Sequence, residues 1–277
     1  MIKYNEPMSK HTSLRVGGKA KVYFIPQSRE ELIYFLKTNK LPLLFIGLGS
    51  NLLVLDKGFS GVVINTMAIK NITINDNYIK ADTGASLAKL ARFAKNNNFT
   101  GFSFFIGIPG SIGGALAMNA GAFGFETWEY IHEVETINSN GDINIRNIDD
   151  YEVSYRNVKH NYKDEYFLSA KFVSKNDVKD ESIIKLIKKR NKAQPIGSAS
   201  CGSVFKNPKN HYAGDLIEKA GLKNFCIGKA CVAEKHANFI INTGGATSLD
   251  VYKLIKHIKN VVKSKFAIEL EEEVKII

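Results

Sequence analysis

The sequence predicts a mixed α+β fold, and three observations support this prediction. Apolar residues make up 44% of the 277-residue chain, which is enough for a sizeable core. Short apolar runs bounded by turn residues, such as 41–47 and 61–66, are typical of buried strands. Residues 251–262 instead carry apolar side chains every three or four positions, which is the spacing of one helix face.

Residues 1–68 are expected to form a first domain. Ser28-Arg29-Glu30-Glu31 is a capping-box pattern, and it predicts a helix that runs to about Asn39. The apolar run 41–47 predicts a buried strand, and 61–66 predicts another. Together these segments predict a β-α-β unit near the N-terminus.

Residues 69–175 are expected to form a second domain that contains two hairpins. The stretch 72–82 predicts a hairpin that turns at Asn75-Asp76-Asn77, and 134–145 predicts one that turns at Asn140-Gly141. The other patterned segments of this section are an amphipathic helix over 86–97, a glycine-rich run over 107–124 and a strand over 166–174.

Residues 176–277 are expected to form a third domain. Two short helical patterns and a strand-turn-strand pattern come first, over 181–190, 214–222 and 230–242. A clear amphipathic helix follows, with one apolar face made of Val251, Leu254, Ile255, Ile258, Val261 and Val262. In the last stretch, AIELEEEVKII, apolar and charged residues alternate and predict a half-buried strand with one acidic face. Glu272 is the exception, because it falls on the otherwise apolar face.

The chain is basic, with 38 Lys and Arg against 27 Asp and Glu and a formal net charge of +11. Its lysines are spread out, and the densest cluster, 185–192, lacks the interleaved aromatic residues of a nucleic-acid groove. Two interpretations remain open: a solvated basic surface, and a surface that attracts anionic small ligands. Nucleic acid is not expected as a partner.

Three cysteines, an odd number, argue against a disulfide framework. Cys226, Cys231 and His236 raise the alternative of a metal site, but their spacing is loose for zinc and no fourth ligand stands nearby. We therefore expect buried thiols and no metal. No apolar run approaches the roughly 20 residues that span a bilayer, and residues 1–13 lack the apolar core of a signal peptide. Both observations predict a cytoplasmic protein without membrane insertion.

Two glycine-rich segments form the strongest functional pattern: IGLGSNLLV at 46–54 and GIPGSIGGALAMNAGAFG at 107–124. Glycine lets several backbone N–H groups point at one spot, where a phosphate accepts from them. Neither segment matches a P-loop, which needs a lysine, or a Rossmann loop, which needs a third glycine. The residues alone leave two interpretations open: a backbone cradle for an anionic ligand such as a nucleotide cofactor, and two tight turns packed on a small-residue interface.

The two segments closely resemble the flavin-binding segments of the UDP-N-acetylenolpyruvoylglucosamine reductase (MurB) family. The resemblance covers nearly the whole chain, because further motifs stand in the family's order: HTSLRVGGKA, SYRN, CGSVFKNP, LIEKAGLK, KHANFIINTGGAT and LEEEV. It implies an FAD-binding region of the vanillyl-alcohol-oxidase/PCMH type, in two subdomains, 1–68 and 69–175. It also implies an α+β substrate-binding domain over 176–277, whose final strand 267–277 returns toward the active site.

The resemblance implies a reaction in which NADPH reduces bound FAD, and the flavin then reduces enolpyruvyl-UDP-N-acetylglucosamine to UDP-N-acetylmuramate, a precursor of bacterial peptidoglycan. We expect a cytoplasmic, monomeric enzyme with this UDP-sugar as its partner. The residues that the resemblance assigns to FAD binding are Gly47, Gly49, Ser50, Asn51, Leu52, Pro109, Gly110, Ser111, Gly113, Gly114, Asn119, Ala120 and Gly121.

The resemblance also assigns three catalytic residues. Arg156 matches the catalytic arginine, whose fixed fork of donors suits a carboxylate that gains charge in the transition state. Ser203 matches the proton donor, because even a weak acid can protonate a strongly basic enediolate when held close. Glu273 matches the catalytic glutamate before the valine of LEEEV, and Glu272 is taken as a rim residue. Without the family, Arg156 reads as a surface ion pair and Ser203 as a turn serine.

Six more positions resemble substrate contacts: Tyr155, Lys192, Gln194, Asn207, His236 and Asn238. The chain departs from the family pattern in two places. Val158 stands where the family commonly has a serine, so a hydroxyl that would orient Arg156 is missing. The short link between 158 and 166 lacks the tyrosine loop of the family's long form. Two competing functions are an FAD-linked oxidase of another small substrate on the same fold, and a non-catalytic nucleotide-binding module.

Overall fold

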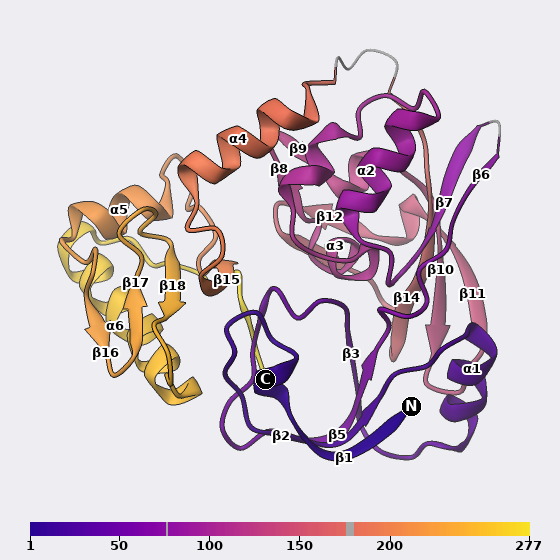
Figure 1. The fold of residues 1–277 in the computed structure, drawn as a ribbon, viewed down its shortest axis with the longest axis horizontal. Coiled ribbons are helices and arrows are strands. Elements are labelled where there is room, and N and C mark those ends of the chain that lie inside the picture. The colour runs from indigo at the N-terminus through magenta and orange to yellow at the C-terminus, as the bar shows by residue number, and fades with distance from the viewer. Residues whose placement is uncertain (76, 176–179) are drawn as a thin grey trace. The chain divides into compact units, whose positions relative to one another are not determined.

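The computed structural model describes residues 1–75, 77–175 and 180–277 (Figure 1). The chain divides into two compact units. Unit 1 comprises Met1–Lys3, Val22–Leu48 and Gly61–Arg190, and unit 2 comprises Tyr4–Lys21, Gly49–Ser60 and Asn191–Ile277. The three-domain division of the sequence stays a prediction, and Asn176, at its last boundary, lies outside the described residues.

The first sheet of unit 1 has the strand order β1-β2-β5-β3. Its strands are β1 (Ile2–Pro7), β2 (Lys19–Phe24), β5 (Phe59–Asn65) and β3 (Leu43–Ile46), and the division between the units falls inside the first three. Strands β3 and β5 run parallel, with Leu43 opposite Val62. Strand β3 was predicted to be buried, but only Ile46 is buried and the other three residues are half-buried, because β3 is an edge strand with one neighbour.

Helix α1 (Arg29–Thr38) lies between β2 and β3, as predicted. Ser28 caps it by accepting a hydrogen bond from the backbone N–H of Glu31 at 3.2 Å, which satisfies one of the unpaired donors of the first turn. Leu32 and Leu36 of the helix are buried with Phe24 and Ile64 of the sheet, so the β-α-β unit has its own small core.

The second sheet of unit 1 is antiparallel, in the order β11-β10-β14-β7-β6. Its strands are β6 (Ile72–Asn75), β7 (Tyr78–Asp82), β10 (Ile131–Asn138), β11 (Ile143–Asn147) and β14 (Glu165–Phe172). Both predicted hairpins are present: β6 pairs with β7, and β10 pairs with β11. Gly141 takes a φ of 86° in the second turn. Asp76, in the predicted turn of the first, lies outside the described residues.

Two helices cover this sheet, α2 (Leu87–Asn96) and α3 (Ile112–Met118) (Figure 1). Leu87, Leu90, Ala91 and Ala94 of α2 are buried, which confirms its predicted amphipathic face. Helix α3 formed from the glycine-rich run and packs on β14 and β7. An aromatic cluster fills the core beside them: Phe102, Phe104, Phe105, Tyr130 and Phe172.

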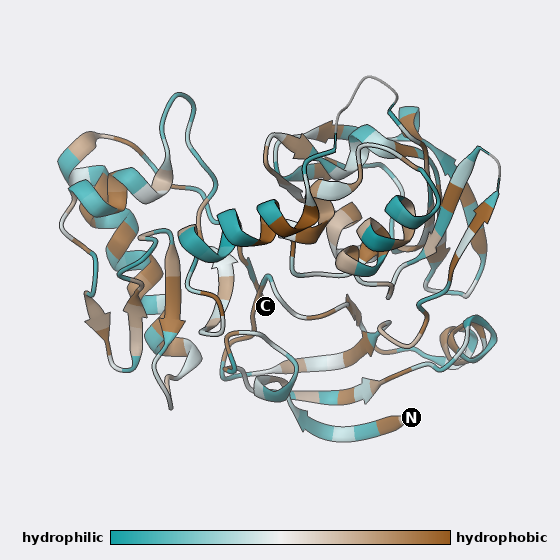
Figure 2. Ribbon diagram, turned by 45° about the horizontal axis from the view of Figure 1, so that its top comes forward, coloured by the Kyte–Doolittle hydropathy of each residue, from teal (hydrophilic) through white to brown (hydrophobic). Residues whose placement is uncertain are grey.

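Short elements complete unit 1 and lead into unit 2. They are η2 (Ser103–Gly107), β8 (Gly121–Ala122), β9 (Phe125–Glu126), η3 (Thr127–Tyr130), η4 (Ile148–Asp150), β12 (Glu152–Ser154), β13 (Asn157–Lys159) and α4 (Ile183–Ala193). Figure 2 shows the first half of α4 hydrophobic and its second half hydrophilic. This helix confirms the one predicted over 181–190.

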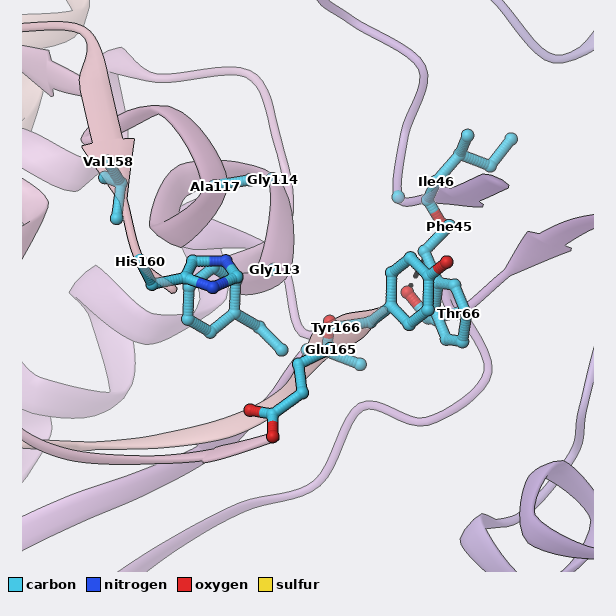
Figure 3. Close-up of a pocket in the computed structure, with 13 residues that line it drawn as sticks. Phe45, Ile46, Thr66, Gly113, Gly114, Ala117, Val158, His160, Glu165 and Tyr166 are labelled. Atoms are coloured by element: carbon cyan, nitrogen blue, oxygen red, sulfur yellow. Dashed lines mark hydrogen bonds between the residues drawn. The ribbon is translucent and has the colours of Figure 1, made fainter. Parts of the chain in front are cut away.

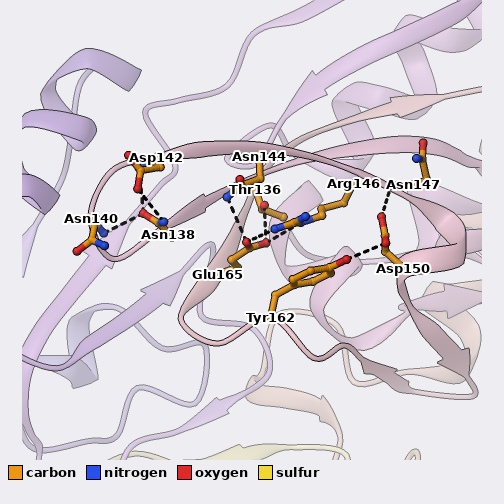
Figure 4. A network of polar contacts seen from close by, with 10 residues as sticks. All are labelled: Thr136, Asn138, Asn140, Asp142, Asn144, Arg146, Asn147, Asp150, Tyr162 and Glu165. Carbon is orange, nitrogen blue, oxygen red and sulfur yellow. Dashed lines mark hydrogen bonds and ion pairs between the residues drawn. The ribbon is translucent and has the colours of Figure 1, made fainter.

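A polar network ties β14 to β10 and β11 (Figure 4). The Glu165 carboxylate accepts from the Thr136 hydroxyl at 2.8 Å, from the Asn144 amide at 3.1 Å and from the Arg146 guanidinium. Burial alone would raise the pKa of Glu165, but the hydrogen bonds from Arg146 and Thr136 hold that pKa below its usual range. The carboxylate is therefore ionised at neutral pH.

Unit 2 has a sheet of order β15-β18-β17-β16 and two helices, α5 (Ala213–Lys219) and α6 (Ser248–Phe266). The strands are β15 (Ala199–Ser203), β16 (Cys226–Ile227), β17 (Ala230–Val232) and β18 (Phe239–Asn242), and η1 (Met8–Lys10) and β4 (Leu52–Leu53) also belong to this unit. The predicted final helix is confirmed, with Val251, Leu254, Ile255, Ile258 and Val262 fully buried. Val261 is only half-buried.

The predicted strand over 267–277 is wrong in its extent. Only β19 (Lys275–Ile276) is a strand, paired in parallel with β4, and a single bridge joins Glu272 to Phe205. The partners are too short for a longer ladder, since β4 has two residues. The predicted alternation of burial persists, with Leu270 and Val274 buried.

The expectation of three buried thiols is also wrong. Cys201 is buried and free, but Cys226 and Cys231 form a disulfide across β16 and β17. Directly opposite residues in an antiparallel hairpin come close, and their Cα atoms lie 4.1 Å apart. An odd cysteine count does not exclude such a local pair. Among the described residues, no group of three or more His, Cys, Asp or Glu is placed to hold a metal ion. No helix in the described ranges has the length and apolar character to cross a membrane.

Leu254→Ala should lower the free energy of unfolding by about 2–5 kcal/mol, because it removes a fully buried side chain and leaves a cavity. Leu249→Ala, at a 49% exposed position of the same helix, is the control and should change it by less than about 0.5 kcal/mol. Urea denaturation followed by circular dichroism measures both. Equal effects of the two variants would contradict the assigned face of α6.

Candidate functional site

Unit 1 contains a pocket of about 220 Å³ (Figure 3). Three of the residues assigned to FAD binding line it, Gly47, Gly113 and Gly114. The other lining residues are Phe45, Ile46, Thr66, Thr83, Ala117, Val158, His160, Glu165, Tyr166 and Phe167. The pocket thus has mostly apolar walls with a few hydroxyl and charged groups, which is the usual character of a small-molecule site.

The glycines of the pocket serve two different purposes. A Cβ on Gly47 would overlap with the Ser111 hydroxyl, and one on Gly113 would overlap with the Thr83 hydroxyl. The chain's own packing therefore requires glycine at both positions. Gly114 differs, because it is exposed and the nearest atom to a Cβ there is Ser111 Oγ at 3.6 Å. A longer side chain on Gly114 would stand in the pocket.

The first turn of α3 does not offer the row of amides that the sequence suggested. The N–H of Ile112 donates to Ala85 O at 2.9 Å, and that of Gly113 donates to Thr83 O at 2.8 Å. The Gly114 N–H donates to the Ser111 hydroxyl, the N-cap of the helix. These three amides are satisfied within the chain, so the expected cradle cannot consist of them. Nearby, Pro109 is exposed and Gly110 accepts a hydrogen bond from Leu87 N.

The first glycine-rich segment, 46–54, passes from unit 1 into unit 2 after Leu48, so its residues from Gly49 onward belong to unit 2. Gly49 has a φ of 70°, and a Cβ there would overlap with the carbonyl of His11. Asn51 donates from Nδ2 to the Glu273 carbonyl at 3.0 Å and accepts from Lys275 N at 3.0 Å. Leu52, on β4, lies opposite Lys275, and Ser50 is half-buried. This segment is thereby tied to the C-terminal tail.

In unit 1 the end of α3 is joined to Arg156. Asn119, the C-cap of α3, is 2% exposed, and its side chain contacts Glu126, Ser154 and Trp128. Ala120 is buried and accepts hydrogen bonds from Thr127. Asn119 and Ala120 therefore hold the local fold. The backbone carbonyl of the next residue, Gly121, accepts a hydrogen bond from Arg156 Nη2 at 2.9 Å, so this segment also holds Arg156.

Arg156 lies in the two-residue turn between β12 and β13, with a φ of 53°. Its Nη1 donates to Asn119 O at 3.1 Å and pairs with Glu126 Oε1 at 3.2 Å, and its Cζ lies 4.8 Å from the centre of the exposed Tyr155 ring. The Arg156 side chain is 14% exposed, so it is more enclosed than that of a surface ion pair.

In unit 2, Ser203 and Glu273 belong to adjacent stretches of chain. Ser203 ends β15, and Glu273 N donates to the carbonyl of the next residue, Val204, at 2.8 Å. The Glu273 carboxylate is also close enough to affect Cys201: burial, to which this charge adds, raises the pKa of the Cys201 thiol to about 12. Cys201 is thus an inert thiol, and Glu273 is bonded to Val204, the residue that follows Ser203.

Asn238 supports the Ser203 segment. Asn238 is 4% exposed. Its side-chain amide accepts from Phe205 N at 3.0 Å and donates to Phe205 O at 2.8 Å, as the backbone of a paired strand would. Its carbonyl accepts from Val204 N at 2.9 Å. A substrate contact through this amide would cost these bonds.

The other proposed substrate residues lie in unit 2 with varied surroundings. His236 accepts from Asn238 N at 3.3 Å, and burial lowers the pKa of its ring, which favours a neutral imidazole. Asn207 is exposed, and its Oδ1 accepts from Ala213 N, the first residue of α5. Lys192 is exposed on α4, and Gln194 is half-buried just after it.

Sequence reasoning missed several residues at these places. Thr66, Thr83, His160 and Glu165 line the pocket, and Glu126 pairs with Arg156. Each stands alone in its segment without a recognisable motif, and the fold brings them together over long sequence separations. For Thr66 and Thr83, the only signal in the sequence was a threonine at the end of a predicted strand.

Comparison with known proteins bears on both units. The model of an FAD binding domain matches residues 20–145, and the model of the UDP-N-acetylenolpyruvoylglucosamine reductase C-terminal domain matches residues 194–277. A UDP-N-acetylenolpyruvoylglucosamine reductase of Caldanaerobacter subterraneus subsp. tengcongensis is 44% identical over 99% of this chain and 92% of its own. A Legionella pneumophila (strain Corby) reductase of the same name is 46% identical over 99% and 91%.

A solved structure agrees with these relatives. The crystal structure of the Thermus caldophilus reductase (MurB) matches with a TM-score of 0.81 and 28% identity, covering 100% of this chain and 98% of that one. The mixed α+β fold with an FAD-binding region is thereby confirmed, as is the assignment as a flavin-dependent oxidoreductase. The chain belongs to the UDP-N-acetylenolpyruvoylglucosamine reductase family.

Proposed function

We propose that this protein catalyses the NADPH-dependent, FAD-mediated reduction of enolpyruvyl-UDP-N-acetylglucosamine to UDP-N-acetylmuramate. The observation that carries the proposal is the pairing of the tail with residues 204–206, just after β15, in which Glu273 is bonded to Val204, the residue that follows Ser203. A proton donor and a carboxylate on adjacent stretches of chain suit a reaction that ends in protonation of a carbon atom.

The pocket of unit 1 fits part of FAD. Gly114 leaves its side open, Ala117 and Phe167 provide apolar walls, and the hydroxyls of Thr66 and Thr83 provide polar groups. When bound, FAD would supply hydride transfer between NADPH and the enolpyruvyl group. The thirteen residues assigned to FAD by the resemblance are proposed contacts. The Asn119 side chain and the first-turn amides of α3 already make hydrogen bonds within the chain.

Arg156 is proposed to bind the carboxylate of the enolpyruvyl group. A guanidinium is charged at any physiological pH, and its planar fork matches a carboxylate. Contacts with two carbonyls and Glu126 fix its direction in advance, so little reorganisation is needed as negative charge grows on the substrate.

Ser203 is proposed to deliver the proton to C2 of the substrate, and Glu273 to orient it or stabilise the acid. Among the described residues, the hydroxyl of the half-buried Ser203 makes no hydrogen bond to another protein group. The hydroxyl is therefore not committed to a cap or turn, which was the alternative that the sequence favoured.

An anaerobic titration tests the reaction. NADPH should bleach the yellow FAD-loaded protein, and enolpyruvyl-UDP-N-acetylglucosamine should restore the colour in a 1:1 ratio. An FAD-linked oxidase would recover its colour only with oxygen. Protein that takes up no FAD, or recovers no colour with the substrate, would refute the proposal.

Ser203→Ala should leave bleaching by NADPH within about twofold of wild type, because the hydroxyl is not needed for that step. Recovery of colour with the substrate should slow by about 10²-fold or more, which is the usual contribution of a general acid. Stopped-flow absorbance at the flavin band measures both steps. An unchanged second step would remove the serine from the mechanism.

Gly114→Leu should weaken FAD binding at least about tenfold, because the side chain would occupy the pocket. Gly114→Ala is the graded control, since its Cβ would meet only Ser111 Oγ at 3.6 Å. Titration of FAD into cofactor-free protein measures affinity, and circular dichroism checks that both variants fold. If Gly114→Leu binds FAD as wild type does, the cofactor does not pass over this glycine.

A further inference from the structure

Three consecutive glutamates of the tail have three different environments. Glu271 is 72% exposed and pairs with Lys206 at 2.6 Å. Both carboxylate oxygens of Glu272 accept from Lys259 Nζ, each at 2.8 Å. The backbone of Glu273 is bonded on both sides, its N–H to Val204 O and its carbonyl to Asn51 Nδ2.

The pair of Lys259 and Glu272 is more enclosed than the other ion pairs of the tail. Its side chains are 28% and 23% exposed, against 62% and 72% for Lys263 and Glu269. Burial raises the pKa of Glu272, yet the hydrogen bond from Lys259 and the charges of Lys259 and Lys256 outweigh it and lower that pKa. A partly buried pair is less screened by water than an exposed one, so it restrains its two side chains more strongly.

The backbone at Lys259 is also held in place by the packing of α6. Lys259 projects from α6 between Ile258 and Val262, which are fully buried, and α6 is the central helix of the unit 2 core. Backbone hydrogen bonds hold the tail: its residues 271–274 pair with residues 204–206, and residues 275 and 277 pair with residues 51 and 53. The salt bridge adds a side-chain link between this tail and α6, one residue before Glu273.

We propose that Lys259 is a positioning residue for the reaction: by binding Glu272 it helps to hold the tail in the register that keeps Glu273 against Val204, the residue next to Ser203. The role rests on the proposed function, in which Glu273 assists proton delivery by Ser203. It also explains Glu272, the carboxylate that broke the apolar alternation, since its partner comes from α6 and not from solvent.

The test compares Lys259→Met with Lys263→Met in the FAD-loaded enzyme. Lys263→Met removes an exposed pair between the same helix and the same tail, so it is a matched control. In Lys259→Met, bleaching by NADPH should stay within about twofold, and recovery of colour with the substrate should slow by about tenfold, because a small displacement of a catalytic group is costly. The solvent deuterium isotope effect on recovery should rise, since proton delivery becomes more limiting. Lys259→Arg should restore the rate, and Glu272→Gln should resemble Lys259→Met.

A second readout needs no cofactor. Hydrogen–deuterium exchange in cofactor-free protein should quicken for residues 271–275 in Lys259→Met and stay unchanged in Lys263→Met, because the Glu273 N–H loses its fixed acceptor. Wild-type-like recovery, isotope effect and exchange in Lys259→Met would overturn the inference. A wild-type enzyme that fails to recover colour with the substrate would refute the proposed function, while faster exchange in Lys259→Met would still support the restraint of the tail.

Discussion

The arrangement in unit 2 depends on one carbonyl group, that of Val204. It accepts from Glu273 N at 2.8 Å and from Val274 N at 3.3 Å, and these bonds decide which tail residue lies against Val204, the residue after Ser203. A shift of one residue would turn every side chain of the tail to the opposite face and exchange Glu273 for Glu272. Buried Leu270 and Val274 oppose such a shift, because they would be exposed by it. Hydrophobic burial thus acts with the backbone hydrogen bonds and the Lys259–Glu272 salt bridge to fix the register of the tail.

The glycine-rich segments show that one composition can serve packing and binding together. Gly47 and Gly113 are required by contacts inside the chain, whereas Gly114 leaves space at the pocket. The two interpretations that the residues left open, tight packing and a ligand cradle, therefore apply to different glycines of the same segments. Close approach of α3 to its neighbours is what brings Gly114 to the pocket wall, so the packing glycines position the binding one.

Much of the fold could be predicted because its signals are local. Ser28 and the face of α6 follow from capping and periodicity, and both hairpins follow from alternation with turn residues. The disulfide and the short extent of β19 could not be predicted, because they depend on which strands come together. At the site, Ser203 and Glu273 were singled out by a family resemblance and not by their own pattern. Glu126 and Lys259 were missed since their importance lies in partners 30 and 13 residues away.

The sequence resemblance predicts that Val158 stands where the family commonly has a serine, so that an orienting hydroxyl is missing, and the structure shows which groups direct the Arg156 guanidinium. Two carbonyls at the end of α3, Asn119 O and Gly121 O, accept from it, and Glu126 balances its charge. Glu126 is itself held by the Asn119 amide at 2.7 Å. Backbone carbonyls cannot rotate away as a serine hydroxyl can, so this support is rigid. Val158 itself is half-buried and adds an apolar side chain to the pocket of unit 1. The orientation of Arg156 therefore comes from the backbone of the glycine-rich run and from Glu126, without a hydroxyl at position 158.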